Sequence, residues 1–74
     1  MDAYTKLYKT YEKYMNEADK MIREAYKAKR HPEYMDVDLL RGKLLAISEV
    51  TTNDFMSKKA KEKESELDCM LYDL

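Results

Sequence analysis

The chain has 74 residues, with 14 Lys and Arg against 15 Asp and Glu, so it is long enough for one domain at most. A net charge of −1 excludes a globally basic nucleic-acid-binding protein and an acidic mimic of nucleic acid. A single cysteine excludes an internal disulfide. Because the sequence has no long apolar run, we expect no signal peptide and no membrane span. We therefore expect a cytoplasmic protein.

One glycine and one proline, among abundant helix-forming residues, predict an all-α fold. The first helix is predicted over residues 2–30, where apolar side chains recur every three or four positions. Its two heptad core positions hold Tyr4, Tyr11, Ala18 and Ala25 in one set, and Leu7, Tyr14, Met21 and Ala28 in the other. Pro32 disfavours helical geometry at His31, so we expect this helix to end near Arg30.

A second helix is predicted over residues 36–51, with Asp36 as its N-cap. Its main apolar face comprises Val37, Leu40, Leu44, Ile47 and Thr51. Other apolar or small residues lie away from that face, which suggests that the helix is covered on more than one side: Leu39, Gly42, Leu45 and Ala46. In a helix interior, glycine lowers the stability by about 1 kcal/mol relative to alanine, so Gly42 needs an explanation. Either a neighbouring backbone approaches it closely, or it is an exposed glycine that is tolerated.

A third helix is predicted over residues 53–72. Its apolar positions fall about 120–140° out of phase with those of the second helix, so a break is expected at residues 51–54. Threonine and asparagine there are poor interior residues and good N-caps. One continuous, kinked C-terminal helix is the alternative. The expected fold is a single helical domain, residues 1–74, in which a long N-terminal helix precedes two shorter antiparallel helices. An alternative form of this fold is a bundle that is completed by dimerisation.

The lengths of the first two helices predict a surface without cover. The first spans about 43 Å and the second about 24 Å, so an antiparallel second helix covers only the half with Ala18, Met21, Ile22 and Ala25. The third helix is expected to be a poor cover for the rest, because residues 61–66 are all polar. The predicted partner-binding residues are therefore Tyr4, Leu7, Tyr8, Tyr11, Tyr14 and Met15, with Leu39, Gly42 and Leu45 from the second helix. The competing interpretation is that the tyrosines close the protein's own core.

The sequence contains no motif that predicts catalysis or a cofactor. His31 lies near Glu33, Asp36 and Asp38, a set that contains metal-ligand types, but the spacing matches no known site and solvated loop residues are the favoured interpretation. Cys69 lies off the apolar face of the third helix and is expected to be an exposed thiol without a role. We expect no enzyme, no metal, no cofactor and no small-molecule substrate.

The leading hypothesis is a small non-enzymatic protein-binding module that acts as an inhibitor, regulator or adaptor by occluding a partner surface. The length and composition are similar to those of small regulators encoded by low-GC bacteria and their phages. One alternative is a dimeric bundle that binds RNA or DNA through the basic side of the first helix. It is disfavoured because that side also carries Glu12, Glu17, Asp19 and Glu24. The other alternative is a structural homo-oligomer.

Overall fold

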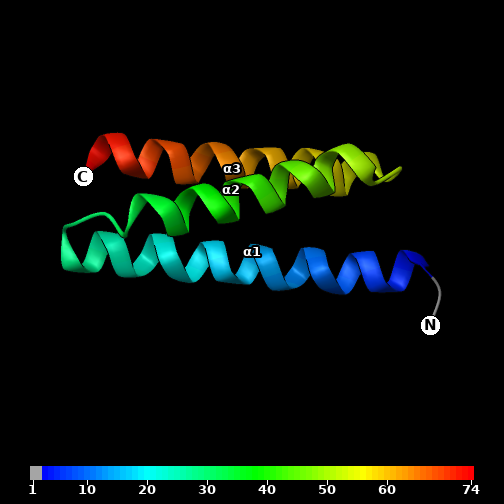
Figure 1. Ribbon diagram of the computed structural model, residues 1–74, viewed down its shortest axis with the longest axis horizontal. Helices are drawn as coiled ribbons and strands as arrows, with labels where there is room; N and C mark the ends of the chain where they lie inside the picture. Colours follow the sequence, from blue (N-terminus) through cyan, green and yellow to red (C-terminus); the bar gives the residue numbers. More distant parts are fainter. Residues whose placement is uncertain (1–2) are drawn as a thin grey trace.

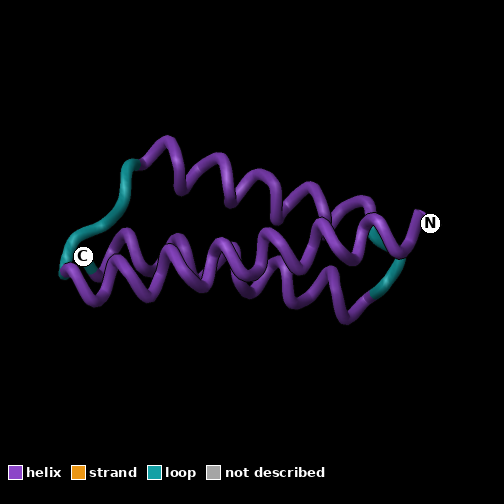
Figure 2. The backbone as a smooth tube through the Cα atoms, turned by 90° about the horizontal axis from the view of Figure 1, so that it is seen from below, coloured by secondary structure: helices purple, strands orange, loops and turns teal. Residues whose placement is uncertain are grey.

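The computed structural model describes residues 3–74, which form three helices: α1 (Ala3–Ala28), α2 (Tyr34–Val50) and α3 (Asp54–Asp73). The predicted all-α fold, with one long helix followed by two shorter ones, is confirmed. The three helices lie along the long axis of a bundle measuring 40 × 19 × 18 Å (Figures 1 and 2). Every pair of helices is in contact, α2 and α3 most extensively. The alternative of one continuous C-terminal helix is wrong.

The direction of the helices places α3 parallel to α1. The α1–α2 loop and the C-terminus lie at one end of the bundle, and the start of α1 and the α2–α3 loop lie at the other (Figure 1). Two hydrogen bonds mark the two ends of this parallel pair. Asn53 donates to the Tyr4 hydroxyl at 3.2 Å, and the Tyr26 hydroxyl donates to Asp73 at 2.8 Å. The α3 helix therefore runs along α1 for nearly its whole length.

The buried core contains three of the four residues in one predicted heptad set, since Tyr4 is exposed. The buried apolar side chains are Tyr11, Ala18 and Ala25 from α1; Val37, Leu40, Leu44 and Ile47 from α2; and Met56, Ala60, Leu67 and Met70 from α3. The other heptad set of α1 lies at the edge of this core, where Leu7, Tyr14 and Met21 are partly buried. Alanine at the centre of α1 and α3 lets the helices approach closely, so the core is thin and depends on leucine and methionine from α2 and α3.

The end of α1 lies two residues before the predicted one. Lys29 has a positive φ of 58°, its N–H donates to the Tyr26 carbonyl, and the N–H of Arg30 donates to the Ala25 carbonyl. This pattern is a Schellman motif, in which a left-handed residue just after the helix satisfies its last carbonyls. The position is usually glycine, so the lysine there gave no sequence signal.

The prediction of Asp36 as the N-cap of α2 is wrong. The helix begins at Tyr34, with Glu33 in the N-cap position and no side-chain hydrogen bond closing the cap. Asp36 lies in the first turn, where a carboxylate interacts favourably with the positive end of the helix dipole. The tyrosine ring of Tyr34 lies against His31, with centroids 5.0 Å apart, and this contact accompanies the earlier start.

The break before α3 lies where the polar residues predicted it. The backbone of Thr51 is extended, and its hydroxyl accepts a hydrogen bond from the Asn53 N–H at 3.1 Å. Asn53 is the N-cap of α3, because its side chain accepts a hydrogen bond from the Met56 N–H at 2.9 Å. Ser57 then donates to the carbonyl of Ser48 at 2.9 Å, which ties the first turn of α3 to the last turn of α2.

Candidate functional site

The structure changes the assignment of the tyrosine-rich half of α1, because α3 covers it. Tyr11 is only 8% exposed and belongs to the core, so the expectation that it contacts a partner needs correction. Leu7, Tyr14 and Met15 are partly buried against the same core. Tyr4 and Tyr8 remain about half exposed at the end of the bundle. Of the predicted tyrosine surface, only this pair is available to a partner.

The cover comes from the polar segment of α3 that was expected to cover poorly. Lys63 and Glu64 keep only 15% and 14% of their side chains exposed. The Lys63 ammonium lies 2.6 Å from Asp19 of α1, and the Arg41 guanidinium of α2 lies 2.7 Å from Glu64. Long charged side chains bury their aliphatic stems along apolar surface while their ends form ion pairs. Composition alone cannot show this behaviour.

Three pKa values reflect this packing. Burial raises the pKa of the Tyr11 hydroxyl; Tyr8 raises it further, and the nearby charge of Lys63 offsets part of the rise. Burial by itself would lower the pKa of the Lys63 ammonium, but hydrogen bonds to Asp19 and Glu66 outweigh it, so the pKa lies above its usual value. The hydrogen bond to Glu64 raises the pKa of Arg41. All three shifts describe packing between helices, and none of them lies at an exposed cleft.

The residues considered as a cation site do not form one. Within residues 3–74 no group of three or more His, Cys, Asp or Glu side chains is arranged to hold a metal ion. Nδ1 of His31 lies 3.1 Å from the carbonyl of Pro32, and its ring lies against Tyr34. Cys69 is exposed, as predicted. None of the three described helices is both long enough and apolar enough to cross a membrane.

The main exposed apolar surface lies on α2. Half of the ten exposed large hydrophobic side chains in the described chain belong to this helix of 17 residues. Five residues spaced four, three, four and four positions apart share the side opposite the core, and we call them the α2 outer face: Met35, Leu39, Gly42, Ala46 and Val50. Met35 is 73% exposed, Val50 68% and Leu39 58%. As expected, α2 is covered on more than one side, by α1 and by α3. Within residues 3–74, no helix covers the α2 outer face.

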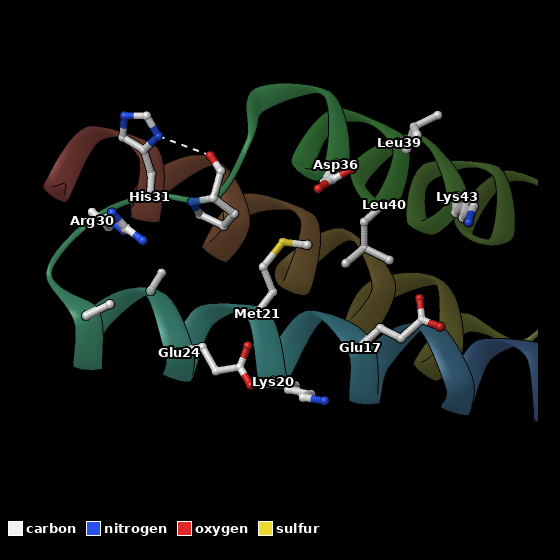
Figure 3. Close-up of a pocket in the computed structure, with 13 residues that line it drawn as sticks. Glu17, Lys20, Met21, Glu24, Arg30, His31, Asp36, Leu39, Leu40 and Lys43 are labelled. Carbon is white, nitrogen blue, oxygen red and sulfur yellow. Dashed lines mark hydrogen bonds between the residues drawn. The ribbon is translucent and has the colours of Figure 1, made fainter.

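The α1–α2 groove adjoins the α2 outer face. It has a volume of about 520 Å³, and Met21 and Ala25 of α1 and Leu40 of α2 form apolar parts of its wall. Leu39 belongs to both surfaces: it lines the groove, but its side chain is directed away from α1, whereas Leu40 is directed toward α1 (Figure 3). Charged residues of both signs surround the groove, among them Lys20, Lys43 and Asp36. The small-residue half of α1 is thus covered by α2 only in part.

The sequence predicted part of this surface. Of the predicted partner-binding residues of α2, Leu39 and Gly42 belong to the α2 outer face, whereas Leu45 is exposed but lies off this face. Met35 and Val50 were missed, although both are in phase with Leu39, Gly42 and Ala46, and that phase was the signal that could have revealed them. Gly42 has no close neighbour, because a Cβ built there meets nothing within 4 Å. Gly42 is therefore an exposed glycine. The other explanation, a close approach by a neighbouring backbone of the same chain, does not fit the structure.

Comparison of the chain with protein-family models, with curated proteins and with solved structures found no match. A function must therefore be inferred from the exposed surface of the chain, from its apolar residues and its charges.

Proposed function

We propose that this chain is a small non-enzymatic protein-binding module that acts as an inhibitor, regulator or adaptor by covering a partner's surface with the α2 outer face. The observation that carries the proposal is the exposure of Met35, Leu39 and Val50 on one side of a helix whose other side is already buried. Contiguous exposed apolar side chains are characteristic of protein-binding sites. A cytoplasmic regulator of the kind encoded by phages or mobile elements fits the chain's size and its single cysteine.

The chemical class of the partner surface follows from the composition of this face. Methionine, leucine and valine offer flexible apolar contacts, and Asp36 and Lys43 beside them give one charge of each sign. A partner surface with an apolar centre and a mixed-charge rim fits this arrangement, as in helix-in-groove recognition. The α1–α2 groove extends the apolar contact beyond Leu39 toward Met21 of α1.

Capture from a lysate of the source organism tests the proposal. The wild-type chain is compared with the variant Met35→Glu with Leu39→Glu, which places two charges on the α2 outer face. The matched control is Phe55→Glu with Tyr72→Glu, which places the same charges on exposed aromatic positions of α3. Circular dichroism establishes that all three proteins are folded.

We expect the wild type and the α3 control to retain the same partner and the α2 variant to lose it. Calorimetry with the purified partner should then show the loss as a fall in affinity. If the α2 variant retains the partner as well as the wild type does, the α2 outer face is not the binding surface. A third variant, Tyr4→Glu with Tyr8→Glu, reports whether the exposed tyrosine pair serves instead.

A further inference from the structure

Gly42 is not explained by the packing of a single chain. It lies in the interior of α2, where glycine costs about 1 kcal/mol relative to alanine. Its backbone is helical, with no positive φ that would call for glycine, and a Cβ at this position meets nothing within 4 Å. Glycine at this position lowers the stability of the helix and has no packing role within the chain. This combination favours a contact between Gly42 and another molecule.

The order of residue sizes along the first four positions of the α2 outer face is complementary to its own reverse. Read along the helix, these four positions run large, large, small, small: Met35, Leu39, Gly42 and Ala46, and Val50 lies beyond them, outside the pairing. When two such helices pack antiparallel, the layers place Met35 opposite Ala46 of the second copy and Leu39 opposite Gly42 of the second copy. Every layer then combines one large and one small side chain, which lets the two backbones approach closely. A two-fold axis produces each of these contacts twice.

The charges beside this face follow the same pattern. Asp36 and Lys43 are seven residues apart and so lie on the same edge of α2, the edge that lines the α1–α2 groove. In residues 3–74 neither has an ion-pair partner within 4.0 Å, and the Lys43 ammonium lies over the Tyr14 ring at 5.1 Å from its centroid. In the antiparallel arrangement, the same edges of the two helices meet. Lys43 therefore lies about two residues, or about 3 Å, along the axis from Asp36 of the second copy. Its long side chain reaches that carboxylate when the ammonium leaves the Tyr14 ring, and the reciprocal pair forms on the same edge.

We infer that the α2 outer face binds a second copy of this chain, with the two α2 helices antiparallel about a two-fold axis midway between Leu39 and Gly42. The inference rests on the proposed function, since both require this face to bind protein, and it names a second copy as an occupant. A contact strip about 25 Å long and about 10 Å wide buries about 250 Å² per copy, well below a stable specific interface of about 1,200 Å² in total. The dimer is therefore weak and concentration-dependent, so a foreign partner can compete with it.

Sedimentation equilibrium from about 10 μM to about 1 mM, the range that suits an interface of this size, tests the inference. We expect the wild type to shift from monomer to dimer. Leu39→Lys should abolish the dimer by placing two ammonium groups at the axis. Gly42→Leu should abolish it by filling the position that receives Leu39 of the second copy, although leucine favours the helix. Tyr72→Lys, at an exposed position on α3, is the matched control and should leave dimerisation unchanged.

A charge exchange tests the arrangement itself. Asp36→Lys alone and Lys43→Glu alone should each weaken the dimer about tenfold, because each places like charges on one edge. The double variant re-forms the pairs with the signs exchanged and should restore dimerisation toward the wild-type level. A wild type that stays monomeric over the whole range overturns the inference, as does a double variant that is no better than the single ones.

These outcomes separate the inference from the proposed function. A monomeric wild type that still captures a foreign partner through Met35 and Leu39 refutes the dimer and supports the function. A wild-type dimer that is lost on Leu39→Lys, together with foreign capture that does not depend on the α2 outer face, supports the dimer and refutes the function.

Discussion

Replacing Gly42 by alanine should stabilise the single chain at low concentration. Glycine loses more conformational freedom on folding than alanine does, and in a helix interior the difference is about 0.5–1 kcal/mol. Nothing opposes this gain, because a Cβ at position 42 meets no atom within 4 Å. An unfolding entropy of about 2.1 cal/mol/K per residue gives about 0.16 kcal/mol/K for 74 residues, so the melting temperature should rise by about 3–6 °C.

Thermal unfolding followed by circular dichroism at low micromolar concentration measures this rise, because the proposed dimer is not populated there. The matched control is Ala46→Gly, one turn further along the same face, which should lower the melting temperature by a similar amount since Ala46 is also exposed. If Gly42→Ala destabilised the dilute protein, some part of the same chain would have to approach residue 42 closely. The conclusion that residue 42 faces open space would then be wrong.

Three further predictions concern the packing and the ends of the helices. Lys29→Gly should raise the free energy of unfolding by about 1 kcal/mol, because φ is 58° there and left-handed geometry strains a lysine; a chemical-denaturation midpoint that fails to rise would contradict the Schellman motif. Leu44→Ala should cost about 2–5 kcal/mol, since the side chain is completely buried, and the same titration should show a large loss or no folded state. Stability should also fall at high pH. Tyr11 and Lys63 have raised pKa values in the folded chain, so they stabilise it fully below their ordinary pKa values of 10.0 and 10.5, and this contribution is lost as the pH rises through the folded values. The melting temperature should therefore be flat up to about pH 9 and fall above it, less steeply in Tyr11→Phe; an identical fall in that variant would argue against a role for Tyr11.

The sequence predicts the parts of the fold that depend on periodicity and local chemistry. The spacing of Tyr11, Ala18 and Ala25 identifies the buried side of α1, and Thr51 and Asn53 mark the break before α3 because their side chains hydrogen-bond nearby backbone N–H groups. Local signals fail where the chain uses an unusual residue. Lys29 adopts a conformation that normally indicates glycine, so the end of α1 could not be located from its residue type.

The candidate site was harder to predict, because its exposure depends on which helix covers which face. The polar segment around Lys63 and Glu64 suggested that α3 would leave the tyrosines of α1 exposed, but the stems of these side chains lie along the bundle and their charged ends pair with Asp19 and Arg41. The direction of a long side chain is a tertiary property. With α3 over Tyr11, half of the exposed large hydrophobic side chains of residues 3–74 lie on α2, and Met35 belongs to the α2 outer face by phase alone.

The ion pairs made by Lys63 and Glu64 also determine how the three helices align along the bundle axis. Alanine and methionine contacts are permissive, since a helix that slides past such neighbours meets similar apolar surface again. Lys63 and Glu64 are adjacent in α3, yet one pairs with α1 and the other with α2. A slip of α3 by one helical turn, about 5.4 Å, would separate both of these pairs, leaving Lys63 with only Glu66 of its own helix and moving the mostly buried Glu64 away from Arg41. These two polar residues thus select one axial register among several that the apolar core alone would tolerate.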